Sequence, residues 1–172
     1  MNANDTTSAV MSEALRAVSP ALERYTRTTI ADIWKRAGLS ARDRSLVTLA
    51  VLIARNQTTE LPAYLARALD SDVKPSEISE AITHLAFYSG WGSAIPAAAI
   101  TADVFRARGI GADQLPPAQP SLLPMNEADE ARRAAFVEQS VGPVSRGVVE
   151  YTSDPLFHEV WLRPGLAPRA SR

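Results

Sequence analysis

The chain has 172 residues, of which 46% are hydrophobic and 22% charged, a composition typical of one soluble globular domain. Its formal net charge is −1 and its Lys and Arg residues form no basic run, which argues against nucleic acid or an anionic membrane as a partner. The absence of Cys excludes disulfides, thiolate metal sites and a Cys nucleophile.

The apolar stretches are short, and the longest, such as residues 46–54, cannot cross a bilayer. The polar start of the sequence lacks the charged and apolar regions of a signal peptide. A cytoplasmic protein without membrane contact is therefore expected.

Helical periodicity dominates the first part of the chain. Moderately amphipathic segments over Met11–Tyr25 and Ile30–Ala37 predict a helix each, with a break between them. Ser40 is a good N-cap for a strongly apolar helix that runs to about Arg55, and Asp43 suits the first turn of this helix. An α-helical entry segment followed by a core helix is expected.

Two further helices are predicted downstream. Thr58 or Thr59 could cap a helix over residues 60–71, in which Pro62 is tolerable because it falls in the first turn. A helix over residues 76–88 follows Pro75. Its apolar residues recur at intervals of three and four, as a core-facing stripe requires: Ile78, Ala81, Ile82, Leu85 and Ala86.

The sequence SGWGS at residues 89–93 interrupts the pattern, and Ser93 could cap an Ala-rich helix that stops at Gly109. No segment of the first 110 residues alternates with the period of two that a half-buried strand needs. The fold class expected is all-α, with a helical domain over residues 1–110.

The remainder divides into a linker and an arm. Four prolines fall within residues 111–126, which predicts an extended linker over the surface. Residues 127–172 are predicted to form a C-terminal helical arm.

The arm ends by repeating a phrase from near the beginning of the chain. With a shift of 127 positions (161 − 34 = 127), Trp34, Arg36, Gly38, Leu39 and Arg42 recur as Trp161, Arg163, Gly165, Leu166 and Arg169. With a shift of 126 (145 − 19 = 126), Ser19, Tyr25 and Thr26 recur as Ser145, Tyr151 and Thr152. The arm is interpreted as the start of a second copy of the module, and we expect Trp161, Arg163 and Leu166 to pack on the body of this chain or a neighbour, much as Trp34, Arg36 and Leu39 do.

Three segments in a fixed order carry a resemblance to a known family. They are GLSARDRSLVTLA (residues 38–50), ELPAYLARAL (60–69) and HLAFYSGW (84–91), and the last precedes the Ala-rich helix. Over about residues 36–105 the chain resembles the carboxymuconolactone decarboxylase family, a branch of the alkylhydroperoxidase D-like (AhpD-like) superfamily. The resemblance implies a compact all-α fold, assembly into a homo-oligomer (trimer or hexamer), a site near subunit interfaces, a small-molecule substrate and no organic cofactor.

The resemblance also constrains the chemistry. In the thiol peroxidase branch, the Cys-x-x-Cys pair, its His and its relay Glu would fall at Gln57, Glu60, Tyr64 and Ser45, so this chain has none of these groups. Thiol peroxidase activity is therefore excluded. The decarboxylase-like branch has Glu and His at the positions of Glu60 and Tyr64, and this chain has Tyr in place of that His.

Glu60 and Tyr64 stand one turn apart on one helix face, and Arg67 follows three residues later. A carboxylate, a phenol and a guanidinium could therefore converge, as decarboxylation needs groups that hold a carboxylate and transfer a proton. The alternative is an exposed Glu/Arg pair with a half-buried Tyr. We expect Glu60 and Tyr64 to be catalytic and Arg67 to bind substrate.

Glu80, His84 and Tyr88 form a second polar stripe, at intervals of four residues. His84 beside Glu80 could act as a general base, or it could be a structural His satisfied by Glu80 or a neighbouring subunit. We expect His84 to be catalytic and Tyr88 to bind substrate. With two His in the chain and no His/carboxylate cluster at metal spacing, no metal site is expected.

Arg42 and Trp91 complete the predicted substrate-binding set. Arg42 stands at the positive end of a helix, so an anion or an interfacial carboxylate should hold it, and the interface is favoured. Trp91 could line a pocket or seal the core, and core packing is favoured.

The functional expectation is a cofactor-independent decarboxylase or lyase that uses acid/base catalysis on a small carboxylated or lactone-type molecule. The alternative is a non-catalytic binding or assembly protein on the same fold.

Overall fold

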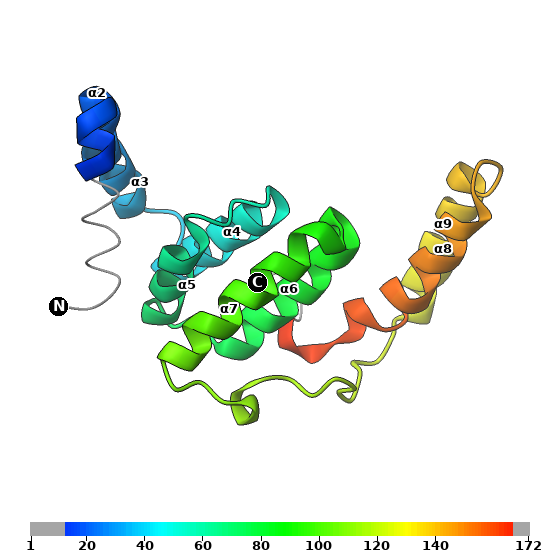
Figure 1. The fold of residues 1–172 in the computed structure, drawn as a ribbon. Coiled ribbons are helices and arrows are strands. Elements are labelled where there is room, and N and C mark those ends of the chain that lie inside the picture. The colour runs from blue at the N-terminus through cyan, green and yellow to red at the C-terminus, as the bar shows by residue number, and fades with distance from the viewer. Residues whose placement is uncertain (1–12, 167–172) are drawn as a thin grey trace.

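The structure, a computed structural model, describes residues 13–166. These residues form helices and connecting segments without any strand, which confirms the predicted all-α fold (Figure 1). A central body carries one arm at each side. The predicted helix start at Met11 and the repeated Arg169 lie outside the described residues.

The body consists of helices α4 (Ala41–Ala54), α5 (Leu61–Asp70), α6 (Pro75–Ser89) and α7 (Trp91–Ala107). Helix α6 packs along α7, and α4 contacts the other three. The buried side chains at their centre come from all four helices and from the turn between α5 and α6: Leu49, Ile53, Leu61, Leu65, Ala68, Val73, Ile78, Ala97 and Phe105. The predicted stripe of α6 faces this core, because Ile78, Ala81 and Ala86 are buried.

One predicted helix cap is confirmed by the structure, and two are wrong. Ser40 caps α4 as predicted, since its hydroxyl accepts a hydrogen bond from the Asp43 amide at 3.0 Å. Thr58 and Thr59 do not cap α5, because this helix begins at Leu61 and the chain is still turning at these threonines. Ser93 does not cap α7 either. Gly90, with φ of 87°, completes the reversal in one residue, so α7 begins at once with Trp91.

The N-terminal arm also differs from prediction. The expected break between the two first helices does not exist, because a π-helical turn at residues 26–30 joins α2 (Pro20–Tyr25) to α3 (Ala31–Lys35). The Thr28 hydroxyl donates to the Arg24 carbonyl at 3.0 Å within this turn. The interruption lies earlier, at Ser19, where Pro20 supplies no backbone donor.

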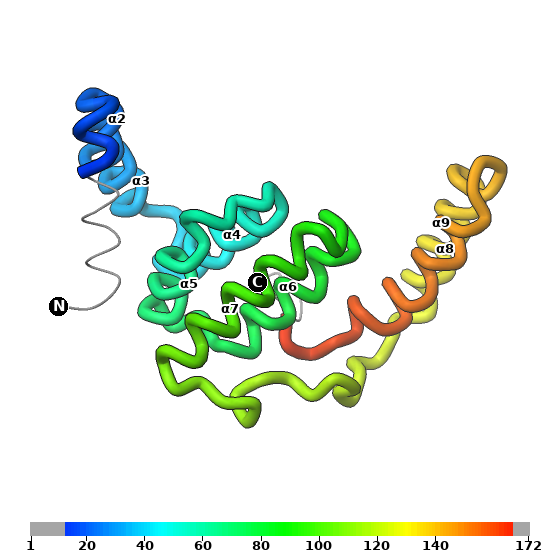
Figure 2. The backbone as a smooth tube through the Cα atoms, viewed as in Figure 1, coloured from blue at the N-terminus to red at the C-terminus, as the bar shows by residue number. Residues whose placement is uncertain are grey.

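Beyond α7 the chain crosses the body and returns to it (Figure 2). The linker over residues 111–126 is extended apart from a 3₁₀ turn at Ala112–Gln114. Helices α8 (Glu127–Val141) and α9 (Arg146–Tyr151) form the second arm. A π-helical turn at Thr152–Phe157 and short 3₁₀ turns at Val160–Leu162 and Pro164–Leu166 follow.

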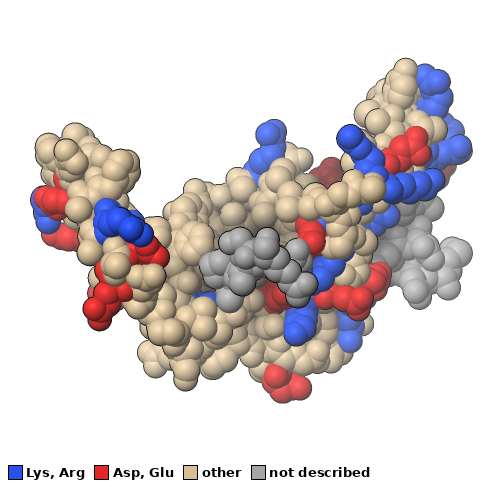
Figure 3. Space-filling view, turned by 180° about the vertical axis from the view of Figure 1, so that it is seen from behind, with Lys and Arg blue, Asp and Glu red and all other residues tan. Residues whose placement is uncertain are grey.

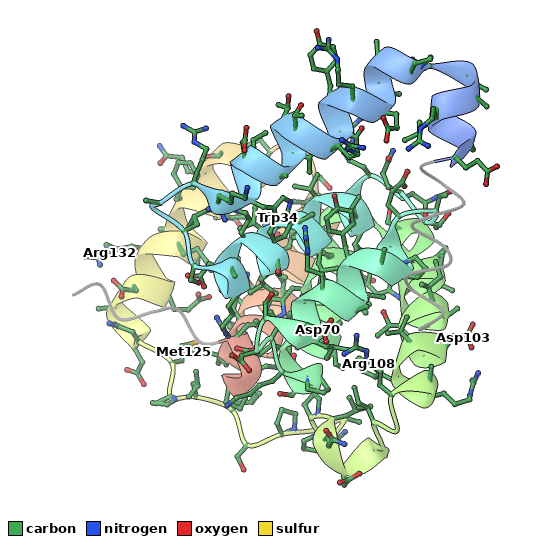
Figure 4. The ribbon with its side chains drawn as sticks, turned by 90° about the vertical axis from the view of Figure 1, so that its left-hand side faces the viewer. Trp34, Asp70, Asp103, Arg108, Met125 and Arg132 are labelled. Carbon is green, nitrogen blue, oxygen red and sulfur yellow. The ribbon has the colours of Figure 1, made fainter. Side chains whose placement is uncertain are left out.

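The distribution of charged side chains on the surface is consistent with a net charge of −1. On the face drawn in Figure 3, acidic and basic side chains are interspersed and the arms stand to either side of the body. Exposed Asp70 and partly exposed Arg108 tie the end of α5 to the end of α7 through hydrogen bonds of 2.6 and 3.2 Å (Figure 4). None of the described helices is long and apolar enough to cross a membrane.

Candidate functional site

The C-terminal segment over residues 160–166, called here the tail, docks on α6 through a buried ion pair. Arg163 donates two hydrogen bonds to the Glu80 carboxylate, at 2.7 and 2.8 Å, and others to the carbonyls of Pro117 and Ala118 in the linker. Both side chains are at least nine-tenths buried. The bond to Glu80 raises the pKa of Arg163 above its usual value, so the guanidinium stays charged. The tail is thus held at a fixed place on α6.

An aromatic cluster extends this contact one turn further along α6. The Trp161 indole nitrogen donates to the Tyr88 hydroxyl oxygen at 2.7 Å. The same indole meets the His84 ring edge-on at 5.9 Å between centroids and stacks on Phe157 at 5.8 Å. The expectation that the repeated residues pack on the body is therefore fulfilled within one chain. Their positions differ from those of the first copy, because Trp34 packs on α5 instead.

A cavity of about 330 Å³ lies between α4, α6 and the tail. Its lining residues are Leu46, Ala50, Ala81, His84, Leu85, Tyr88, Trp161 and Leu166. The walls are largely apolar, and the polar side-chain groups come from His84, Tyr88 and Trp161. A small molecule with a flat or apolar body and a few oxygen atoms matches this chemistry.

The hydrogen bonds of His84 define its tautomer. Its Nδ1 lies 2.8 Å from the Glu80 carbonyl oxygen, which can only accept, so Nδ1 carries a proton. Its Nε2 has no hydrogen-bond partner among the described residues. The expected contact of His84 with the Glu80 carboxylate is absent, because that carboxylate pairs with Arg163. The remaining nitrogen, Nε2, is thus available to accept or deliver a proton.

Tyr88 supplies a second group at the same cavity. Its oxygen accepts from Trp161, so its own O–H proton remains available for a ligand oxygen. The side chain is 56% exposed and lines the cavity from the last turn of α6. His84 and Tyr88, both predicted from the sequence, are therefore brought together by the structure.

Glu60, Tyr64 and Arg67 belong to a second group of residues, on α5. The Tyr64 ring lies 6.1 Å from the Trp34 ring, and the Arg67 guanidinium lies 4.1 Å over the same indole. Figure 4 places Trp34 beside the body helices near the end of the N-terminal arm. Glu60 is the half-buried N-cap of α5 and forms no ion pair with Arg67. None of these residues lines the cavity at His84.

Two other predicted binding residues have partners that the sequence did not indicate. Arg42 forms ion pairs with Glu77 of α6 and with Asp43, so a carboxylate of the same chain, and not an anion or an interface, holds it. Trp91 is 56% exposed and touches Phe87 edge-on at 5.1 Å. Its predicted core packing is wrong, since the small residues Ala94 and Ala97 fill the buried face of α7.

A larger cavity of about 490 Å³ lies between α6, α7 and the linker. The hydroxyls of Thr83 and Thr101 line it but donate to carbonyls of their own helices, at 3.1 and 2.7 Å. Arg106, also in its lining, pairs with Asp103. No lining residue can exchange a proton near neutral pH, so the smaller cavity is the better candidate for acid/base chemistry.

The cavity-lining residues Leu46 and Ala50 were not predicted, because they are ordinary apolar positions of α4. Trp161, Arg163 and Leu166 were predicted to dock but not to lie at a site. The signal that could have connected them is the repeat itself, because a repeated Trp and Arg predict a specific receiving surface.

Comparison with known proteins agrees with the resemblance. Residues 20–103 match the model of the carboxymuconolactone decarboxylase family. The 4-carboxymuconolactone decarboxylase of Acinetobacter baylyi is 33% identical over 84 residues, which are 49% of this chain and 63% of the relative. The nitrosuccinic acid decarboxylase of Metarhizium robertsii is 35% identical over 82 residues, 48% of this chain and 57% of the relative.

The chain thus spans less than two thirds of the length of these relatives. The matched segment contains α2 to α6 and most of α7, which includes His84, Tyr88 and Glu80 but not the tail. Over residues 20–103, this helical module is thus similar to the carboxymuconolactone decarboxylase family.

Proposed function

We propose that the protein is a cofactor-independent decarboxylase that acts on a small carboxylated or lactone-type acid at the cavity between α4, α6 and the tail. The observation that carries the proposal is the pair of His84 Nε2 and the Tyr88 hydroxyl, both available to a ligand in one apolar cavity. The match to a family whose curated relatives are named decarboxylases supports the reaction class.

Decarboxylation breaks the bond between a carbon atom and its carboxylate and leaves the electron pair on that carbon. The substrate must take up this pair in its own conjugated group, such as an unsaturated lactone or a nitro group, as the acids named for the two relatives suggest. The Tyr88 O–H would donate a hydrogen bond to the oxygen on which negative charge develops.

His84 would complete the reaction by protonating the carbon. In its imidazolium form, Nε2–H delivers the proton, and the ring returns to the neutral tautomer with hydrogen on Nδ1. The Glu80 carbonyl stabilises this tautomer through its bond to Nδ1 at 2.8 Å. One CO2 leaves, one proton enters the product, and solvent restores the proton on Nε2.

By the family resemblance, Glu60 and Tyr64 are the alternative catalytic residues, at a separate place on α5. Arg67 forms no ion pair with any described residue, so its guanidinium could bind a carboxylate there while stacked on Trp34. Substitution of Glu60 and of His84 in parallel, with the rate of CO2 release as the measurement, decides between the two places.

A non-catalytic binding or assembly role is the second candidate. It is favoured by one observation, that Trp161 and Leu166 of the tail already occupy one side of the cavity. The two functions differ in turnover. Titration calorimetry with 4-carboxymuconolactone and nitrosuccinic acid, combined with detection of released CO2, should give repeated turnovers of at least one acid. Stoichiometric binding without CO2 release would favour the binding role and refute the proposed enzyme.

A further inference from the structure

The N-terminal arm carries the same docking phrase as the tail. Trp, Arg, Gly and Leu stand at positions 34, 36, 38 and 39 in the arm and at 161, 163, 165 and 166 in the tail. A short helix and a turn with π-type hydrogen bonds precede each phrase, at residues 20–30 and at residues 146–157, but the second turn is kinked at Asp154. Trp34 lies in the α-helix α3, whereas Trp161 lies in a 3₁₀ turn. The two segments are therefore equivalent in sequence but not in detailed conformation.

Trp34 of the arm packs on Tyr64 and Arg67, and Arg44 donates to the carbonyls of residues 34, 36 and 39. The two copies differ in their arginine side chains. The Arg163 guanidinium is buried and fully engaged with Glu80 and the linker carbonyls. The Arg36 side chain makes no ion pair or hydrogen bond with any described residue. The arm also exposes a group of apolar side chains to water, which is typical of a surface that binds another protein. They are Leu22, Tyr25, Ile30, Ile33 and Leu39.

The receiving surface on α6 is specific for this phrase. The buried Glu80 carboxylate requires a cation, and the Tyr88 hydroxyl oxygen accepts an indole N–H. A Cβ atom at position 165 would lie 2.5 Å from the Glu80 Cγ, so the residue two places after the arginine must be Gly. The arm meets all three requirements with Trp34, Arg36 and Gly38.

We propose that residues 33–39 of one copy of this chain dock on α6 of a second copy, at the surface that the tail occupies here. Arg36 takes the place of Arg163 on Glu80, and Trp34 leaves Tyr64 and Arg67 to take the place of Trp161 on Tyr88. The occupant is a second copy because the arm projects from the side of its own body formed by α4 and α5 (Figure 1). Its Trp34 ring faces Tyr64 of α5, not α6.

Tail and arm therefore compete for one surface. The tail is tethered to its own body, and a short tether corresponds to an effective concentration on the order of 1 mM. A second copy at micromolar concentration cannot displace it, so the docked tail suppresses this mode of self-association. Release of the tail exposes Glu80 and Tyr88 to the arm of a neighbour.

The test measures the mass in solution of the full chain as a function of concentration by analytical ultracentrifugation. Arg163→Gln should release the tail and raise the mass above that of the native chain, increasingly at higher concentration. The double variant Arg163→Gln/Arg36→Gln should return to the native mass. Arg146→Gln, which removes an exposed arginine of α9, is the matched control and should leave the mass unchanged.

A second variant covers the possibility that Arg163→Gln does not fold. Gly165→Ala retains every charge and dislodges the tail by the clash with Glu80, so it should produce the same association, again dependent on Arg36. The proposal is overturned if a folded Gly165→Ala or Arg163→Gln chain keeps the native mass. It is equally overturned if the added mass persists when Arg36 is replaced, since association would then not use the arm.

Discussion

Two nitrogen atoms of one imidazole ring have different surroundings at the candidate site. The Glu80 carbonyl engages Nδ1 of His84, and Nε2 is left for a ligand. A free carboxylate at Glu80 would have competed for the same ring, but Arg163 holds it. The ion pair with Arg163 thus keeps the Glu80 carboxylate from binding the imidazole of His84, the proposed proton-transfer residue one turn later on α6.

Replacement of Tyr88 by Phe tests the second group of the cavity. The variant keeps the ring but loses the O–H donor, so kcat for decarboxylation should fall about 10- to 100-fold. The free energy of unfolding should change by less than about 1 kcal/mol, because the side chain is largely exposed and the Trp161 N–H can turn to water. Tyr151→Phe, on exposed α9, should retain native kcat. A native kcat in Tyr88→Phe would remove Tyr88 from the mechanism.

Glu130 on α8 provides a pH dependence. Hydrogen bonds from Arg133, together with one from His158, hold its pKa at about 2 despite partial burial. Because the pKa is lower when folded than when unfolded, Glu130 stabilises the protein fully above about pH 4.5 and loses this effect as pH falls towards 2. The maximum is about 3 kcal/mol, less any screening by solvent.

Urea unfolding of Glu130→Gln should therefore show a stability deficit near pH 6 that disappears near pH 2. The control is Glu138→Gln, which breaks an exposed pair with Arg146 and should follow the native pH profile within about 0.5 kcal/mol. A deficit that stays constant between these pH values would mean that the carboxylate charge of Glu130 does not stabilise the fold.

At the scale of elements, helix α4 depends on its first turn. The Ser40 side chain accepts a hydrogen bond from the Asp43 amide at the start of this helix. Ser40→Ala should lower the free energy of unfolding by about 1 kcal/mol, as measured by urea denaturation. Ser121→Ala, at an exposed position in the linker, should leave it within about 0.5 kcal/mol. An unchanged value for Ser40→Ala would show that water replaces the cap at no cost.

The tail is an element whose attachment depends on one ion pair. Arg163→Gln leaves the Glu80 carboxylate buried without a cation, which should destabilise the protein by about 3 to 5 kcal/mol. Arg36→Gln, at the equivalent position of the arm, removes an exposed side chain and should cost less than about 0.5 kcal/mol. Thermal and urea unfolding of the two variants would check this contrast. Equal losses of stability in the two variants would contradict the conclusion that Arg163 holds a buried ion pair and Arg36 does not.

At the scale of the whole molecule, short sequence patterns predicted most of the helices. Contacts between residues far apart in the sequence could not be predicted from these patterns. The stripe of α6 and the cap at Ser40 depend on neighbours within a few residues, and both were predicted correctly. The π-helical turn of the N-terminal arm and the one-residue reversal at Gly90 were missed, because short threonine-rich and glycine segments permit several backbone paths.

The site shows the same limit. His84 and Tyr88 share a helix face, so their proximity was predictable from spacing. The pairing of Glu80 with Arg163 spans 83 positions, and only tertiary packing brings these residues together. The repeat indicated that the tail would dock but could not indicate that α6, rather than α5, would receive it.

The central claim, that decarboxylation takes place at the cavity of His84, is tested most directly by initial rates of CO2 release for two variants in parallel. With 4-carboxymuconolactone or nitrosuccinic acid as substrate, His84→Gln should lose at least about 100-fold in kcat/KM and Glu60→Gln should retain a rate near that of the native chain. Circular dichroism should show both chains folded. The reverse result, a rate that survives in His84→Gln and collapses in Glu60→Gln, would contradict the account and place the chemistry on α5 beside Tyr64 and Arg67.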